Sequence, residues 1–143
     1  MSKIWEQIRA IVKNAKLWYY IGILNEFGGI LMKKIAIASD HRGFKIKEEL
    51  KRYREENGIE YKDYGAYTEE RMDYPIVAKQ VAKSVAKNDD EIGVLICGTG
   101  FGMSIVANKF KGIRCTPCYN EEAAKFARMH NDANILALGA EHL

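Results

Sequence analysis

Short runs of apolar residues alternate with amphipathic stretches along most of this 143-residue chain. A short apolar run predicts a buried strand, whereas apolar residues spaced three and four apart predict a helix with one buried face. The predicted strands span residues 35–38, 59–64, 93–96, 113–119 and 135–138, and the predicted helices span residues 43–56, 75–85, 103–110 and 121–129.

Strands that alternate with helices at this spacing predict βαβ units and a parallel sheet. Because right-handed crossovers place helices on both faces of such a sheet, we expect an α/β fold. It would be a three-layer α/β/α sandwich with a five-stranded parallel, Rossmann-like sheet. Ligands bind at the carboxyl ends of the strands in these sheets, so the turns that follow the strands are the places to search for chemistry.

Residues 1–31 differ from this pattern and are expected to form an N-terminal amphipathic extension to a domain over residues 32–143. Apolar residues recur at helical spacing from Ile4 onward, and the apolar run at 17–24 is too short to cross a bilayer. Three interpretations remain open: an upstream extension before a natural start at Met32, a helix that packs on the domain or on a partner subunit, and a membrane-surface anchor.

Composition narrows the class of protein. The chain is 48% hydrophobic and 29% charged, which is typical of a globular domain. Its net charge is only +3, and no basic stripe of the kind that nucleic-acid binders carry follows Met32. Three cysteines at irregular positions suit a reducing cytosol better than a disulfide framework. We therefore expect a cytoplasmic protein that binds neither nucleic acid nor a membrane.

The densest chemical signal is the run CGTGFG at residues 97–102, which follows an apolar strand and precedes a helix. Glycines let backbone N–H groups approach a ligand, and the start of a helix adds partial positive charge. The run is not a P-loop, because no Gly-Lys-Ser/Thr follows it, and it fits the dinucleotide fingerprint poorly. We therefore predict an anion-binding turn, with a glycine-rich turn that holds no ligand as the alternative.

Three further positions could carry acid–base chemistry. Cys97 stands near a predicted helix N-terminus, where a thiol can act as a base or nucleophile, although a cysteine can also be a small core residue. Asp40-His41 follows the first strand, and His130-Asn131 precedes the last one. A histidine beside a carboxylate or amide suits proton transfer on a small polar ligand, whereas an isolated histidine is usually structural.

Cys115 and Cys118 match the CxxC spacing of a redox pair. They fall within a predicted strand, where residues at this spacing face opposite ways. A zinc site would need a second pair of ligands, and none is evident. We interpret them as two strand cysteines, with a redox protein as the remaining alternative.

Several motifs recur in a fixed order, at residues 37–44, 73–75, 95–104, 107–109, 112–114 and 130–134. Together they resemble the type B ribose-5-phosphate isomerase family, which includes the galactose-6-phosphate isomerase subunits. The likeness covers Met32 to about Ala140.

The resemblance implies a role for each matching residue. A cysteine at the position of Cys97 is the base that moves a proton between C1 and C2 of the open-chain sugar phosphate through an enediolate, and a histidine at the position of His130 helps to open the furanose ring. The loop after the cysteine supplies amides to the oxyanion. The implied substrate-binding set is Asp40, His41, Gly98, Thr99, Gly100, Phe101, Gly102 and Asn131. The family uses no metal and no organic cofactor, and it forms homodimers or homotetramers with sites at the subunit interface.

Two departures from the family pattern keep alternatives open. Glu141 stands where an arginine commonly helps to hold the phosphate, and the chain is expected to lack the C-terminal helix and the two further arginines that follow in relatives. The retained cysteine and histidines favour ribose 5-phosphate as the substrate, and one alternative is an isomerase for a hexose 6-phosphate, either allose or galactose 6-phosphate. The other alternative is a truncated relative that binds sugar phosphates with little or no catalysis.

Overall fold

The computed structural model describes residues 34–142, so the extension predicted over residues 1–31 lies outside the described residues. Within the described part, strands alternate with helices from β1 to β5. The predicted α/β class is confirmed.

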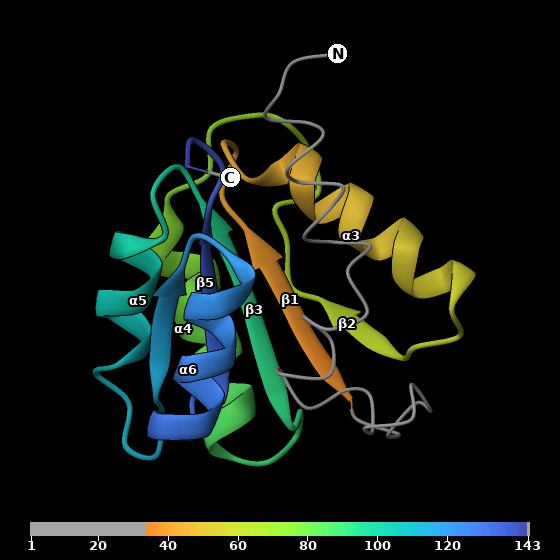
Figure 1. Ribbon diagram of the computed structural model, residues 1–143. Coiled ribbons are helices and arrows are strands. Elements are labelled where there is room, and N and C mark those ends of the chain that lie inside the picture. Colours follow the sequence, from red (N-terminus) through yellow and green to blue (C-terminus); the bar gives the residue numbers. More distant parts are fainter. Residues whose placement is uncertain (1–33, 143) are drawn as a thin grey trace.

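The sheet is built from β1 (Ile35–Ser39), β2 (Tyr61–Asp63), β3 (Ile92–Cys97), β4 (Cys115–Cys118) and β5 (Ile135–Gly139). The strands pair in the order β2-β1-β3-β5-β4, and every pairing is parallel (Figure 1). All six residues of the central strand β3 are buried, as expected for a strand with helices on both sides. Because the strands run in parallel, they all end at one edge of the sheet, called here the carboxyl edge, and begin at the opposite, amino edge.

The helices are α3 (Phe44–Glu56), α4 (Tyr74–Ala86), α5 (Phe101–Ala107) and α6 (Glu121–Asn131). The steps from β1 to β2 and from β4 to β5 run in one direction across the sheet, whereas the steps from β2 to β3 and from β3 to β4 run in the other. Because such crossovers are right-handed, α3 and α6 cover one face and α4 and α5 cover the other (Figure 1).

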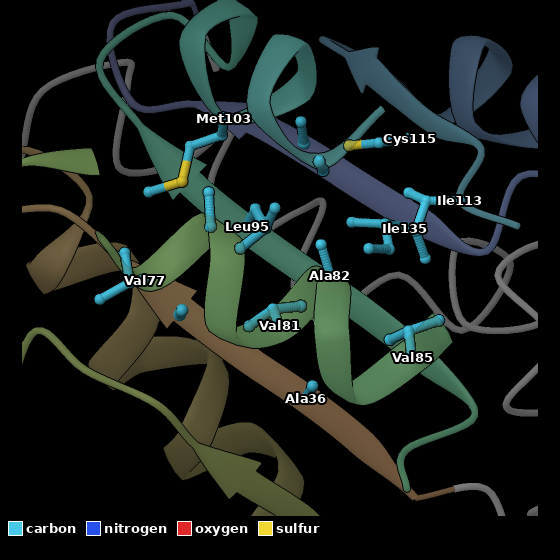
Figure 2. Packing of buried hydrophobic residues seen from close by; sticks show 14 of the residues in the cluster. Ala36, Val77, Val81, Ala82, Val85, Leu95, Met103, Ile113, Cys115 and Ile135 are labelled. Carbon is cyan, nitrogen blue, oxygen red and sulfur yellow. The ribbon is translucent and has the colours of Figure 1, made fainter. Parts of the chain in front are cut away.

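Each face of the sheet has its own apolar cluster. Under α4 and α5, Val77, Val81 and Val85 of α4 pack toward Leu95 of β3 and Ile135 of β5 (Figure 2). The three valines are four residues apart and thus share one side of the helix. Full burial of each contributes about 1.5–3 kcal/mol. The opposite cluster includes Ile37, Ile46, Leu50, Val94, Ile96, Leu136 and Leu138.

Most element boundaries differ from the sequence prediction by one or more residues; the strand predicted at 59–64, for example, spans only Tyr61–Asp63. Two other differences have a cause that the structure shows. The strand predicted at 113–119 is shorter, since the N–H of Arg114 donates to the Asn134 side chain at 2.9 Å instead of joining the ladder. The helix predicted after Gly102 begins at Phe101, directly after Gly100, whose φ of 81° is left-handed. Phe101 and Gly102 therefore lie in the first turn of α5.

A buried ion-pair network joins α3 to the end of β2. The ammonium group of Lys47, which is 0% exposed, lies 2.6 Å from the Asp63 carboxylate, and that of Lys51 lies 2.9 Å from it. Burial alone would raise the pKa of Asp63, but the hydrogen bonds from the two lysines hold it below its usual value. The carboxylate also accepts the Gly65 N–H, and the Gly65 carbonyl accepts the Ser39 N–H. The network thus fixes the segment beside the end of β1.

The substitution Asp63→Asn should lower the free energy of unfolding by about 3 kcal/mol at neutral pH, because it leaves the buried Lys47 charge without its main partner. Denaturant titration measures this loss. The matched control is Glu69→Gln, which removes an exposed ion pair with Lys45 and should change stability by less than about 1 kcal/mol. Equal losses in the two variants would contradict the role given to the network.

The wild-type protein and the Asp63→Asn variant also allow a test of how this stabilisation depends on pH. Because the folded state holds the pKa of Asp63 below its unfolded value, the stabilisation is complete above the unfolded pKa and is lost as the pH falls through the folded one. The stability difference between wild type and Asp63→Asn should therefore narrow below about pH 4. A difference that stays constant down to acid unfolding would show that the carboxylate charge is not involved.

Candidate active site

The predicted site lies where two neighbouring strands send their helices to opposite faces. β1 and β3 are paired, and α3 leaves β1 toward one face while α5 leaves β3 toward the other (Figure 1). Such a switch point opens a crevice at the carboxyl edge of an open α/β sheet. The turns after these strands carry Asp40-His41 and Cys97, so the structure brings these predicted residues to one place.

Cys97 is the last residue of β3 and is only 4% exposed. Its Sγ accepts the N–H of Gly100 at 3.1 Å. This contact closes a tight turn that only a residue with left-handed φ can complete, which explains the glycine at position 100. The sulfur is thus held in a fixed position under the loop formed by residues 98–102.

The loop after Cys97 is packed directly on the end of β5. The N–H of Ala140 donates to the Cys97 carbonyl at 2.7 Å, and the N–H of Glu141 donates to the Gly98 carbonyl at 2.9 Å. A methyl group at Gly139 would lie 2.6 Å from the Thr99 carbonyl oxygen. Since β5 leaves the loop no room to shift, its amides are preorganised.

Asp40 is 5% exposed, and its Oδ1 accepts the N–H groups of Arg42 and Gly43 at 2.9 and 3.0 Å. This carboxylate therefore shapes the turn that leads into α3. The neighbouring His41 is half-buried, and its Nδ1 lies 3.2 Å from the carbonyl oxygen of Met72. The two residues tie the β1 turn to the segment before α4.

A cavity of about 340 Å³ opens beside the loop, a volume within the usual range for small-molecule sites. It lies toward the ends of β4 and β5, and it is lined by Thr99, Phe101, Pro117, Cys118, Tyr119, Gly139 and His142. Neither Cys97 nor Asp40 lines it. The predicted base and the predicted sugar-binding carboxylate therefore lie outside the lining of this cavity, which meets the loop at Thr99 and Phe101.

His130 and Asn131 lie at the other edge of the sheet. They are the last two residues of α6, which starts after β4 at the carboxyl edge and ends before β5 at the amino edge. The six residues of β3 alone separate the two edges by about 17 Å at about 3.3 Å per residue. Within one chain, the predicted catalytic pair of Cys97 and His130 is therefore not brought together.

The surroundings of His130 are exposed and apolar. Its ring meets Phe126 edge to face, with the centroids 5.2 Å apart. Phe126, Met129 and His130 share one side of α6 by their spacing, and the exposed fractions of Phe126 and Met129 are 44% and 64%. Clustered exposed apolar side chains mark contact surfaces between proteins.

Cys115 and Cys118 belong to opposite clusters of the core. Cys115 lies in the cluster under α4 and α5, and Cys118 lies in the cluster under α3 and α6. Burial raises the pKa of each thiol to about 12. This arrangement bears out the interpretation as strand cysteines and removes the basis for a redox pair.

Three residues beside the loop are not among the predicted site residues, although the sequence marks Glu141 as a departure from the family pattern. Tyr74 packs on the loop so closely that a methyl group at Gly102 would lie 2.8 Å from its ring. Tyr74 belongs to the motif at residues 73–75, and this is the sequence feature that could have marked it as a site residue. Arg42 and Glu141 form an ion pair of 2.7 Å beside Gly98. They lie 99 positions apart in the sequence, so only the sheet order reveals their contact.

Two kinds of feature are absent from residues 34–142. No group of three His, Cys, Asp or Glu side chains there is arranged to hold a metal ion. No helix in that range has the length and apolar character required to cross a membrane.

Comparison with known proteins gives consistent matches. A ribose/galactose isomerase family model matches residues 35–143. The chain is 50% identical over 109 residues to ribose-5-phosphate isomerase B of Escherichia coli (strain K12), which covers 76% of this chain and 73% of that protein.

Solved structures agree with these matches. A ribose 5-phosphate isomerase from Thermotoga maritima has a TM-score of 0.77 and 49% identity, covering 79% of this chain and 78% of that one. Ribose-5-phosphate isomerase B from Mycoplasma genitalium, solved with bound ribulose-5-phosphate, has a TM-score of 0.72 and 38% identity, covering 77% of this chain and 74% of that one.

The separation of Cys115 and Cys118 onto two faces predicts that the folded protein forms no disulfide between them under mild oxidation. Peptide mapping by mass spectrometry without reduction measures this. The same treatment in denaturant should produce the disulfide, since the unfolded chain brings the two thiols together freely. A disulfide that forms equally well in the folded protein would contradict the assigned positions.

Proposed function

The chain belongs to the ribose/galactose isomerase family, whose members are aldose–ketose isomerases, and we propose that it interconverts ribose 5-phosphate and ribulose 5-phosphate. The observation that carries the proposal is the extent of the match, which runs through every strand and every turn of the carboxyl edge. The chemistry at that edge fits this reaction, because it offers a cysteine for proton transfer beside a loop of backbone amides.

In the proposed reaction, the Cys97 thiolate removes the proton from C2 of the open-chain aldose. The electron pair of that C–H bond forms the C1–C2 double bond of the enediolate, and the charge moves to O1. The Cys97 thiol then returns the proton to C1, while the proton of the C2 hydroxyl passes to O1, which completes the ketose. General base catalysis of this kind contributes about 10²- to 10⁴-fold to a rate.

The loop after Cys97 would bind the developing oxyanion. Its amides belong to Gly98, Thr99, Gly100, Phe101 and Gly102, of which that of Gly100 also donates to Cys97 Sγ and that of Phe101 to Thr99 Oγ1. Because contacts with β5 hold this loop rigidly, little reorganisation is needed as charge develops, and that is the condition under which oxyanion contacts are strongest. Asp40 and His41, on the neighbouring turn, would bind the sugar.

His130 and Asn131 would reach the same sugar from a second copy of the chain. One copy holds them at the opposite edge of the sheet from Cys97, so a site that uses all of them has to include two subunits. The exposed apolar side chains Phe126 and Met129 beside His130 support an interface there. We propose a homodimer, or a homotetramer built from it, in which His130 opens the furanose ring bound at the partner's Cys97.

A cytoplasmic location accompanies this function. Phosphorylated sugars are intracellular metabolites, and the three cysteines, which are all unpaired and buried, need no oxidising compartment.

The substitution Cys97→Ala should lower kcat/KM for ribose 5-phosphate by about 10²- to 10⁴-fold, because it removes the base. The measurement is formation of ribulose 5-phosphate, with allose 6-phosphate and galactose 6-phosphate assayed in parallel to rank the sugars. Cys115→Ala is the matched control, since it removes a second buried thiol of the same apolar cluster while leaving Cys97 and residues 98–102 in place, and it should keep wild-type turnover. Undiminished turnover in Cys97→Ala would refute the assignment of the base.

Mixing two inactive variants tests the shared site. Cys97→Ala and His130→Asn should each be inactive alone, but mixed dimers contain one site with both native residues. Unfolding and refolding the two variants together in equal amounts should restore about a quarter of wild-type activity, since half of the dimers are mixed and each has one intact site. No recovery, with mixed dimers shown by mass spectrometry, would mean that one chain supplies both residues.

A further inference from the structure

An ion pair crosses the carboxyl edge directly above the turn that follows Cys97. Arg42 comes after β1 and Glu141 comes after β5, and these two strands flank β3 on either side. Arg42 Nη1 lies 2.7 Å from Glu141 Oε1. The pair therefore joins the two outer turns across the middle one.

The pair rests on the backbone of Gly98. A methyl group there would lie 2.9 Å from Arg42 Nη1 and 3.2 Å from Glu141 Oε1. The backbones of both charged residues are fixed, because the Arg42 N–H donates to Asp40 and the Glu141 N–H donates to Gly98. Their side chains are 58% and 51% exposed, so they can change partners while the backbone stays in place.

A guanidinium group in this position is suited to phosphate. Arginine presents a planar set of N–H donors that matches phosphate oxygens, and it stays charged at any physiological pH. The Oδ1 of the nearby Asp40 carboxylate accepts the backbone N–H groups of Arg42 and Gly43, whereas the Arg42 guanidinium pairs with Glu141. Exposed ion pairs contribute little stability, so a phosphate dianion can displace the Glu141 carboxylate at small cost.

We propose that Arg42 binds the phosphate group of the substrate and that Glu141 is a built-in competitor, which occupies the guanidinium until a phosphate replaces it. The identification of the ligand as a sugar phosphate rests on the proposed function. Whether Arg42 binds the phosphate can be tested independently of whether the protein catalyses the proposed reaction.

The test measures binding of inorganic phosphate by calorimetry at constant low ionic strength, which keeps charge effects unscreened. Glu141→Gln should bind phosphate about three- to fivefold more tightly than wild type, because the competing carboxylate is gone. Arg42→Gln should bind it at least about tenfold more weakly, since a charged hydrogen-bond donor is lost. In the double variant the gain from Glu141→Gln should vanish, because that gain acts through Arg42.

Two matched controls separate local contact from overall charge. Glu69→Gln changes the net charge as Glu141→Gln does, and Arg52→Gln changes it as Arg42→Gln does, but both controls alter exposed ion pairs on or beside α3. Phosphate affinity in the controls should stay within about twofold of wild type. The inference is wrong if Arg42→Gln and Glu141→Gln bind phosphate as their controls do. It is also wrong if the tighter binding caused by Glu141→Gln persists in the double variant.

Turnover assays keep this result distinct from the proposed function. If the variants do not show the expected changes in phosphate affinity but the protein isomerises ribose 5-phosphate, the role of Arg42 is overturned and the proposed reaction is unaffected. If the variants show the expected changes in phosphate affinity but the protein turns over no sugar phosphate, Arg42 is supported as the phosphate ligand and the proposed activity is contradicted.

Discussion

All strands of the sheet point in the same direction, and the position of each candidate side chain depends on this constraint. Residues that follow a strand gather at the carboxyl edge, and residues that precede one gather at the amino edge. Asp40, Cys97 and Glu141 belong to the first group, and His130 belongs to the second. A parallel sheet therefore separates the proposed base from the proposed ring-opening residue within one chain, and the catalytic proposal has to include a second copy.

The same edge shows how the fold prepares a site before any ligand arrives. Contacts with β5 leave no space beneath the loop after Cys97, so that the sulfur and the amides are held by backbone hydrogen bonds instead of by flexible side chains. On the other side, the buried pair of Lys47 and Asp63 holds the segment beside the end of β1. The side chains of Arg42 and Glu141 at this edge are exposed, and this is where recognition of a charged ligand can be adjusted.

Much of this could be predicted from the sequence. Apolar runs and helical spacing predict the order of the elements, because apolar residues recur at one spacing along a buried strand and at another along a helix with one buried side. The cysteine and glycine motif could be placed at a strand end for the same reason. The separation of Cys97 from His130 follows from the parallel direction of the strands, because Cys97 ends one strand and His130 precedes another. The insertion of β5 between β3 and β4, in contrast, is not encoded by any local pattern.

The remaining differences also have physical causes. The start of α5 at Phe101 follows from the left-handed backbone of Gly100, and the shortened β4 follows from a side-chain hydrogen bond made by Asn134. The ion pair of Arg42 with Glu141 joins residues from the first and last turns of the sheet, so it becomes visible only once β1 and β5 are placed on either side of β3.

A crystal structure of the assembled protein with ribulose 5-phosphate bound tests the central claim most directly. We expect Cys97 Sγ of one subunit to lie within about 3.5 Å of C1 or C2 of the sugar. We also expect the His130 imidazole of a second subunit to lie within hydrogen-bond distance of an oxygen of the same sugar. A bound sugar contacted by Cys97 while His130 of every subunit faces solvent would contradict the proposed two-subunit site.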